Sequence, residues 1–330
     1  MNEKVSVIVP LYNMADLVGK CLDSLKDQTY QNIEFVVVDD GSSDGSGQIA
    51  DQYGQADPRF KIVHHEVNKG IACGIITGIK NSTGKYVALV DSDNYISEVM
   101  IGRLVELKET YKADIAQGEA LCYVDEREIQ DYPKKEAEIV ILENKQDIIE
   151  DFLLKKHITN NLSVKLFNRA WFDEVEIPEG RQVVDTITML QMVGKSERYV
   201  CTSEYLYYAY MPADSISRGE VSERRISDTV YANDFYCSYI KKNWPDYSDF
   251  CAYRTASTAL WANTKIRKSK IIDNSKKREL LKKFRTDFET NYQDSKDTIY
   301  YSMMPGIMKK VWGLFYYCPF LYNLAQRLHG

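Results

Sequence analysis

Short apolar runs alternate with helix-like patterns through the first 115 residues of the chain. Four of these runs are rich in β-branched residues and nearly continuous in apolar character, as buried parallel strands are. They lie at residues 5–9, 33–38, 60–64 and 86–90. Between them, apolar residues at helical spacing predict helices at 17–25, 71–80 and 96–111. The alternation predicts an α/β fold with a mostly parallel sheet flanked by helices, and ligands at the carboxyl ends of its strands.

The regularity weakens after residue 114. The remaining predicted elements are strands at 115–124 and 139–142, helices at 144–156 and 186–193, and a charged, proline-containing connection at 125–138. From about residue 221 onward the pattern is helical, with tyrosine and tryptophan scattered through it. We therefore place a loose boundary near residue 220, between a domain at 1–220 and a mostly helical C-terminal region at 221–330.

Composition and charge limit the possible partners. Hydrophobic residues make up 44% and charged residues 27% of the chain, as in ordinary soluble globular proteins. The net charge of −6 argues against a nucleic-acid binder, which needs a basic face. The charge is uneven, however, because residues 265–285 contain ten Lys or Arg against two acidic residues. This local excess predicts an anionic partner for the C-terminal region.

Cysteine usage indicates the cytoplasm. The chain has seven cysteines at scattered positions without a C-x-x-C pair, so we expect structural thiols that are mostly buried, rather than disulfides or a zinc site. No secretory signal precedes the strand pattern that begins at residue 5. The four histidines show no metal-ligand spacing with one another or with cysteine, and are expected to be ordinary polar or core residues.

The segment 311–325 is strongly apolar and aromatic, follows Lys309 and Lys310, and contains Pro319. It is shorter than the roughly 20 residues of a membrane-spanning helix. It could be a terminal helix that packs on the core, or an interfacial anchor that acts with the basic stretch at 265–285 on anionic lipid. We expect peripheral association with the inner face of the plasma membrane, although the same segment could form a homo-oligomer interface.

Two acidic clusters follow predicted strands, where an open α/β sheet places its ligands. Asp39, Asp40 and Gly41 follow the run at 33–38, and adjacent aspartates point to opposite sides of a strand. One carboxylate can therefore face a ligand while the other supports the loop, although the same tetrapeptide with Ser42 could be a simple turn.

The second cluster, Asp91-Ser92-Asp93, follows the run at 86–90. The spacing of two residues places both carboxylates on one face, where they repel each other unless a cation lies between them. A Mg²⁺ or Mn²⁺ site is the simplest explanation, with a nucleotide diphosphate as the remaining ligand. The segment after the first strand, Pro10-Leu11-Tyr12-Asn13, contains neither G-x-G-x-x-G nor G-K-[ST], which disfavours a dehydrogenase or a P-loop NTPase.

Several segments in this order resemble bacterial family 2 glycosyltransferases of the capsule and exopolysaccharide type. They are VSVIVPLYN, CLDSLKDQTYQNIEFVVVDDGSSDGS, NKGI, GIKNSTGKYVALVDSDN and, more weakly, KLFNRAWFDEVEIPEGRQVVDTITMLQMV and EYLYYAYMPADSIS. The resemblance covers about two thirds of the chain and stops near residue 220. It implies a GT-A fold, Rossmann-like and with a helical C-terminal extension, in which 1–115 is the donor-binding half and 116–220 the acceptor half.

The resemblance also implies roles for particular residues. Asp91 and Asp93 match the family's D-x-D motif, whose second acid usually binds the metal, and Asp185 matches the catalytic base. The nucleotide-sugar site would comprise Pro10, Tyr12, Asn13, Asp39, Asp40, Gly41, Lys69, Gly70, Asp91, Ser92 and Asp93. The implied activity is metal-dependent, inverting transfer of a hexose or N-acetylhexosamine from a UDP-sugar to a glycan or lipid-linked acceptor in cell-surface polysaccharide assembly.

The chain departs from the family pattern at several positions. Ile75 and Ile76 replace an Arg-Asn pair, Asn94 replaces an Asp, and Val184 replaces the Glu before the presumed base. After the paired tyrosines, Tyr210-Met211-Pro212 replaces basic residues. These changes keep open a catalytically silent subunit that binds nucleotide or a partner protein. A nucleotidyltransferase is disfavoured because no Gly- and Lys-rich triphosphate loop follows the first strand.

Overall fold

The computed structural model of the chain describes residues 3–124, 136–211 and 221–322. Most of the connection at 125–138, Pro212 and the end of the apolar segment at 311–325 lie outside these residues. The chain divides into two compact units, Met1–Ser215 and Ile216–Gly330, which are described separately below.

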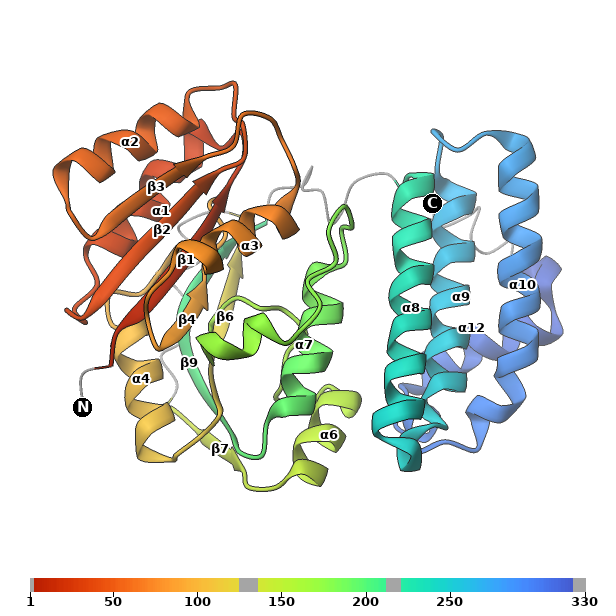
Figure 1. The fold of residues 1–330 in the computed structure, drawn as a ribbon. Helices are drawn as coiled ribbons and strands as arrows, with labels where there is room; N and C mark the ends of the chain where they lie inside the picture. The colour runs from red at the N-terminus through yellow and green to blue at the C-terminus, as the bar shows by residue number, and fades with distance from the viewer. Residues whose placement is uncertain (1–2, 125–135, 212–220, 323–330) are drawn as a thin grey trace. The chain divides into compact units, whose positions relative to one another are not determined.

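The first unit contains a mixed sheet, and the prediction of a mostly parallel sheet flanked by helices is confirmed (Figure 1). Its strands are β1 (Val5–Leu11), β2 (Ile33–Asp39), β3 (Phe60–His64), β4 (Tyr86–Leu89), β5 (Tyr95–Ile96), β6 (Ile115–Tyr123), β7 (Ile139–Leu142), β8 (Lys165–Asn168) and β9 (Tyr199–Tyr210). Their order is β3-β2-β1-β4-β8-β6-β9-β5, with β7 paired to β9. Strand β1 pairs in parallel with β2 and with β4, β2 pairs in parallel with β3, and β6 pairs in parallel with β9. Strand β8 lies between β4 and β6 and runs antiparallel to both.

The helices of this unit pack on both faces of the sheet. They are α1 (Ala15–Lys26), α2 (Ser46–Ala56), α3 (Ile71–Asn81), α4 (Met100–Thr110), α6 (Lys145–Leu154) and α7 (Val184–Lys195), with the 3-10 helix η1 (Arg169–Asp173). Apolar residues of α1, α2 and α4 form one core with alternate residues of β1, such as Val7 and Val9. Helix α3 packs on the other face of β1, against Ile8 and Pro10.

A glycine allows the close approach of α3 to the sheet. A Cβ at Gly78 would lie 2.2 Å from Cγ2 of Ile8, so we expect Gly78→Ala to destabilise the protein by about 1–3 kcal/mol through overpacking. Gly19 on α1 is the matched control, because a Cβ there meets nothing within 4 Å. Gly19→Ala should be neutral or should stabilise by up to about 1 kcal/mol through helix propensity. Urea unfolding of both variants checks this, and equal effects would contradict the packing argument.

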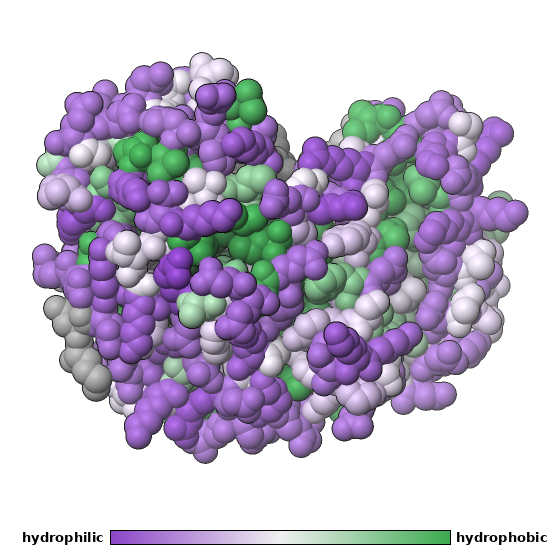
Figure 2. Space-filling model, viewed as in Figure 1, coloured by the Kyte–Doolittle hydropathy of each residue, from purple (hydrophilic) through white to green (hydrophobic). Residues whose placement is uncertain are grey.

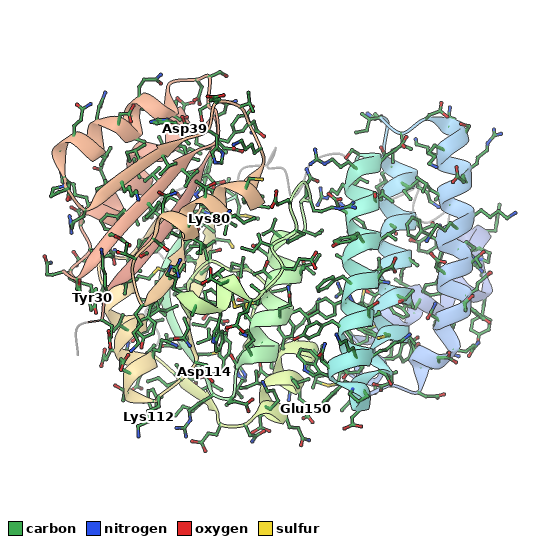
Figure 3. The ribbon with its side chains drawn as sticks, in the orientation of Figure 1. Tyr30, Asp39, Lys80, Lys112, Asp114 and Glu150 are labelled. Carbon is green, nitrogen blue, oxygen red and sulfur yellow. The ribbon has the colours of Figure 1, made fainter. Side chains whose placement is uncertain are left out.

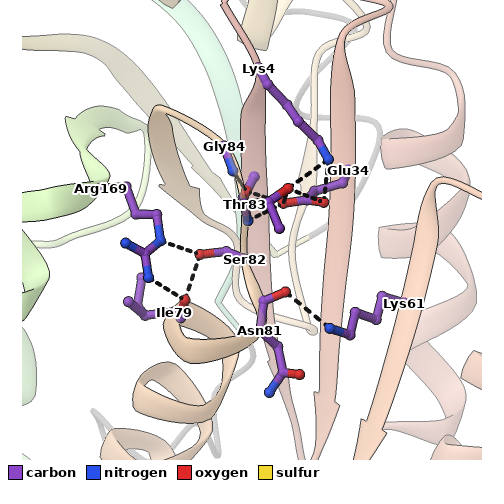
Figure 4. Close-up of polar contacts among 10 residues, drawn as sticks. Lys4, Glu34, Lys61, Ile79, Asn81, Ser82, Thr83, Gly84 and Arg169 are labelled. Carbon is purple, nitrogen blue, oxygen red and sulfur yellow. Dashed lines mark hydrogen bonds and ion pairs between the residues drawn. The ribbon is translucent and has the colours of Figure 1, made fainter.

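A polar network joins the amino ends of β1 and β2 to the segment after α3 (Figure 4). Glu34 accepts hydrogen bonds from Lys4 Nζ at 2.7 Å, from Ser6 Oγ at 2.5 Å and from the Thr83 backbone N–H at 2.6 Å. Burial alone would raise the pKa of Glu34, but these donors lower it to about 2. The ionised form therefore stabilises the fold above the ordinary glutamate pKa, and this contribution is lost as the pH falls toward 2.

The second unit is helical. It contains α8 (Glu223–Asn243), the 3-10 helix η2 (Pro245–Tyr247), α9 (Phe250–Lys268), α10 (Asn274–Lys296), α11 (Ile299–Ser302) and α12 (Gly306–Tyr317). Its core is rich in aromatic residues, with Phe288 in edge-on contact with Trp312 and Phe315. The predicted apolar segment thus contributes three buried aromatic residues to this core, Trp312, Phe315 and Tyr322.

Other side chains near the C-terminus are exposed. Phe320 is 76% exposed and Leu321 51% exposed, and Ile307 at the start of α12 is 71% exposed. Figure 2 shows a mostly hydrophilic surface on the face in view, with hydrophobic side chains gathered in separate patches. Within residues 3–124, 136–211 and 221–322, no helix has the length and apolar character needed to cross a membrane.

All seven cysteines are free thiols. Cys21, Cys201 and Cys251 are buried, as expected from the sequence. Cys122 and Cys318 are exposed, so for these two the expectation of a buried thiol is wrong. Cys122 is the last residue but one of β6, and Cys318 directly follows α12.

Candidate active site

The sheet order brings the ends of β2, β1 and β4 side by side. Because these strands are parallel, the segments after them share one edge of the sheet. Figure 3 shows Asp39 at this carboxyl edge and Asp114 at the opposite end of the sheet. The predicted residues after the three strands, from Tyr12, from Asp39 and from Asp91 onward, therefore all lie at the carboxyl edge.

The segments after β1 and β2 are joined by hydrogen bonds. The Asn13 backbone N–H donates to Ser42 Oγ at 3.0 Å, and Asn13 Oδ1 accepts from the Ser43 N–H at 2.9 Å. Asn13 adopts a positive φ of 50°, which asparagine tolerates better than most residues. Tyr12 beside it is 44% exposed, so its ring is accessible to a ligand at this edge.

Asp40 supports the loop that precedes α3. Its carboxylate accepts from the backbone N–H groups of Lys69 at 2.9 Å and Gly70 at 2.7 Å. Gly41 has a φ of 72°, and a Cβ there would lie 2.8 Å from the backbone carbon of Val67. The loop before α3 is therefore shaped by Asp40, Gly41 and Gly70, and the Lys69 side chain in this loop is exposed to solvent.

Two histidines that the sequence analysis treated as ordinary polar residues pair with these acids. His64 Nδ1 lies 2.9 Å from Asp39 Oδ2, and His65 Nδ1 lies 2.6 Å from Asp40 Oδ1. The parallel register pairs Asp39 directly with His64, which explains the contact. The hydrogen bond to Asp39 raises the pKa of His64. Adjacent Asp and His pairs on neighbouring parallel strands could have revealed this arrangement.

Asp91 is held by three side chains. Its Oδ2 accepts from the Tyr207 hydroxyl at 2.9 Å and lies 3.4 Å from both Ser163 Oγ and Asn94 Nδ2. Burial raises the pKa of Asp91, and these hydrogen bonds partly oppose the shift. Ser92 is buried between the two acids of the motif. Tyr207 and Ser163 have no counterpart in the sequence prediction, because they come from β9 and from the segment before β8.

Asp93 faces a pocket of about 480 Å³. The walls also include Lys20 of α1, Tyr95, Tyr123 and Tyr210. Burial and the neighbouring charge of Asp91 raise the pKa of Asp93 to about 6. A pocket with aromatic walls and a titratable group with a perturbed pKa is the usual character of a ligand site.

The two carboxylates have the chemistry of a site for a hard divalent cation. Each raises the free energy of ionising the other, and a cation between them would remove that repulsion. Mg²⁺ is commonly bound by one or two carboxylates together with substrate phosphates. In the part of the chain that the structure describes, no group of three or more His, Cys, Asp or Glu residues could hold a metal ion. Asp91 and Asp93 thus fit a metal whose other ligands come from the substrate.

Asp185 is the second residue of α7. Its carboxylate accepts a hydrogen bond from the Leu162 backbone N–H. The residue is exposed to solvent, although many protein atoms lie around its carboxylate and remove part of its hydration. This desolvation, followed by the charge of Asp91, raises the pKa of Asp185 to about 7, and Lys165 opposes the shift. The charge of Asp91 therefore raises the pKa of both Asp93 and Asp185.

The departures from the family pattern have structural positions too. Ile75 is 2% exposed and packs in the core, and Ile76 lies beside it on α3. Val184 precedes Asp185 at the start of α7 and is 3% exposed. Ile75, Ile76 and Val184 therefore place aliphatic side chains where the family pattern has polar or acidic ones. With Val184, the carboxylate of Asp185 has no acidic neighbour directly before it in α7.

Comparison with known proteins agrees with this geometry. Residues 6–175 match the family model described as Glycosyl transferase family 2. The chain is 32% identical over 251 residues to Glycosyltransferase GlyG of Streptococcus pneumoniae, covering 70% of this chain and 82% of that protein. It is also 32% identical over 226 residues to Glycosyltransferase GlyA of the same organism, covering 66% of this chain but only 32% of that relative.

The fold is similar to that of TarS residues 1–349 from S. aureus, solved in complex with UDP-GlcNAc. The TM-score is 0.59 at 19% identity, over 89% of this chain and 90% of that one. The α/β sheet with acids at its carboxyl edge is thus a GT-A fold. The chain belongs to glycosyl transferase family 2.

Proposed function

We propose that this glycosyltransferase transfers a sugar from a UDP-sugar to a hydroxyl of a glycan or lipid-linked acceptor, with inversion at the anomeric carbon. The observation that carries the proposal is the placement of Asp91 and Asp93 after β4 at the carboxyl edge of the sheet, where Asp93 lines a pocket with Lys20 and three tyrosines. The charge of Asp91 also raises the pKa of Asp185. The likeness to TarS, whose structure contains UDP-GlcNAc, supports a UDP-sugar donor. In this proposal, residues 1–115 bind the donor and residues 116–220 contact the acceptor.

The proposed reaction is a single displacement. The acceptor oxygen bonds to C1 of the donor sugar while the bond from C1 to the UDP oxygen breaks. Asp185 accepts the proton of the acceptor hydroxyl, which is worth about a hundredfold to ten-thousandfold in rate. Asp93 with Asp91 would hold Mn²⁺ or Mg²⁺, and such an ion supplies Lewis-acid neutralisation of the departing diphosphate. Pro10, Tyr12, Asn13 and the segment Asp39–Gly41 would contact the nucleoside.

The decisive experiment is UDP release from a panel of UDP-sugars by the purified chain, with and without Mn²⁺. We expect slow hydrolysis of one donor that depends on the metal. Absence of both UDP release and calorimetric UDP binding would overturn the proposal. UDP binding without turnover, with any acceptor supplied, would favour the second candidate, a silent nucleotide-binding subunit, for which the aliphatic Ile75 and Val184 are the supporting observations.

Association with an anionic membrane surface is a further part of this proposal. Exposed Ile307, Phe320 and Leu321 supply apolar contacts, and Lys309 and Lys310 lie on α12 close to Ile307 in sequence. We expect Phe320→Ser/Leu321→Ser to weaken binding to anionic vesicles at low salt, because less apolar surface enters the interface. Vesicle co-sedimentation measures this effect. Equal binding by wild type and variant, or no wild-type binding, would contradict it.

A further inference from the structure

A lysine lies completely buried next to the proposed active site. Lys165 is the first residue of β8, which is inserted between β4 and β6, and it is 0% exposed. Fully buried lysines are rare because the loss of hydration of the charge must be compensated by hydrogen bonds or an opposite charge. Burial lowers the pKa of Lys165 to about 7, and the nearby Cys201 and Asp185 oppose this shift.

All three N–H donors of the ammonium group have acceptors within one short segment. Lys165 Nζ donates to Thr159 Oγ1 at 2.7 Å, to the Asn161 carbonyl oxygen at 2.7 Å and to Asn161 Oδ1 at 2.8 Å. An ammonium group has three donors, so its hydrogen-bonding capacity is complete here. The charged form of Lys165 therefore holds residues 159–161 at three points.

A second buried polar side chain holds the same segment. Gln117 of β6 donates from Nε2 to the His157 carbonyl oxygen at 2.7 Å, and its Oε1 accepts from the Thr159 N–H at 3.2 Å. The Tyr199 hydroxyl donates to Gln117 Oε1 at 2.9 Å and fixes the amide. The segment is thus held by buried side chains of β6 and β8, and Asp151 of α6 also accepts from the His157 and Ile158 N–H groups.

The continuation of this segment contacts two of the proposed active-site acids. The Leu162 N–H donates to Asp185, and Ser163 Oγ lies 3.4 Å from Asp91 Oδ2. The next residue, Val164, has a φ of 57°, which is strained for a β-branched side chain. Such a conformation persists only where its surroundings enforce it. Here Val164 lies between Ser163 and Lys165, and its carbonyl accepts from the Gly118 N–H at 3.0 Å.

We infer that Lys165 is a positioning residue for sugar transfer: its three hydrogen bonds hold residues 159–163 in the conformation that presents Leu162 and Ser163 to Asp185 and Asp91. The catalytic consequence rests on the function proposed above, whereas the positioning itself is a property of the fold. Lys165 acts through this segment and is not assigned contact with the reacting atoms.

The test compares Lys165→Met with Lys108→Met. Lys108 is also buried, at 3% exposure, and donates to the carbonyl oxygens of Ala113, at 2.9 Å, and Asp114. Asp114 lies at the end of the sheet opposite the site (Figure 3). Both variants therefore lose a buried ammonium group that donates to loop oxygens, three for Lys165 and two for Lys108, but only Lys165 lies beside the acids.

We expect Lys165→Met to lower kcat about 10- to 100-fold, as loss of an outer-shell partner does, with donor KM and UDP affinity within about threefold. Lys108→Met should keep kcat within about threefold at a similar loss of Tm. Hydrogen–deuterium exchange of the 159–163 amides should accelerate in Lys165→Met alone. If Lys165→Met does not fold, Thr159→Val replaces it, because this substitution removes one of the three acceptors of Lys165. The 159–163 amides should again exchange faster than in wild type, with a smaller loss of kcat than is expected for Lys165→Met.

Unchanged kcat and exchange in Lys165→Met, or in Thr159→Val where that variant replaces it, would overturn the inference. An equal loss of kcat in Lys108→Met would overturn it as well, because the effect would then be general destabilisation. If wild type shows no turnover with any donor, the proposed function fails, while the exchange comparison still decides whether Lys165 positions the segment.

Discussion

Replacing Asp185 with asparagine is expected to lower the rate of sugar transfer by about a hundredfold to ten-thousandfold while UDP affinity stays within about threefold. The amide cannot accept the acceptor's proton, and this is the size of the contribution of a positioned general base. Asparagine keeps the shape of the side chain at the start of α7, so the loss should appear in kcat. Measurement of kcat by UDP release, with UDP affinity by calorimetry, tests this result.

The pH dependence gives a second view of the same residue. Asp185 acts as a base only when it is deprotonated, and its pKa is raised to about 7. We therefore expect kcat/KM of wild type to rise with pH through an inflection near 7, and a cation beside Asp91 to move this inflection to lower pH. Asp173→Asn, at an exposed acid of η1, should keep both the rate and the profile. Turnover of Asp185→Asn at the wild-type rate would rule out Asp185 as the base.

Asp93→Ala is expected to remove the dependence of UDP binding and turnover on Mn²⁺, with a loss of at least about 100-fold in metal-supported activity. Loss of a residue that only hydrogen-bonds to a metal ligand lowers metal affinity or activity by up to about 100-fold. Asp93 is proposed to bind the metal directly, so its loss should cost at least as much. The substitution also removes one of two repelling carboxylates, so UDP binding without metal should not weaken further. Titrations of UDP with and without Mn²⁺ measure both effects.

A matched control separates metal binding from general loss of negative charge. Asp16 is an exposed acid in the first turn of α1, and Asp16→Ala should leave the Mn²⁺ dependence unchanged. Wild-type activity that is indifferent to Mn²⁺ and to chelator would argue against a metal-dependent mechanism. Retention of the full Mn²⁺ effect in Asp93→Ala would move the metal site elsewhere.

The first half of the sheet could be predicted from the sequence because three of its strands, β1, β2 and β4, are buried on both faces. The run at 33–38 contains only apolar residues apart from Glu34, and the observed strand β2 differs by one residue at its end. Strand β9 was missed although it is 12 residues long. Its pairing with β6 shifts register because β9 has extra residues between Cys201 and Tyr207, opposite Gln117 to Ala120. Such irregularities break the simple alternation on which strand prediction depends.

Asp91 and Asp93 could be predicted from their spacing alone. Asp185, far from them in sequence, could be predicted only from the family resemblance. The pairs of Asp39 with His64 and of Asp40 with His65 depend on strand register, which local sequence does not define. Lys165 was missed for a related reason: a lysine at the start of a short strand is usually exposed, and only the insertion of β8 between two other strands buries it.

The insertion of β8 also has a consequence for how the chain folds. Strand β4 forms one edge of the early sheet until residues 165–168 arrive, since β8 pairs with β4 on one side and β6 on the other. As the chain emerges from the ribosome, the first half of the sheet would therefore have an unpaired edge while some eighty further residues are synthesised, from β4 (Tyr86–Leu89) to β8 (Lys165–Asn168). When β8 pairs with β4 and β6, the sheet is completed and residues 159–163 are placed beside Asp91 in the same step. A nascent chain that stops before β8 is open to association with other chains along that edge.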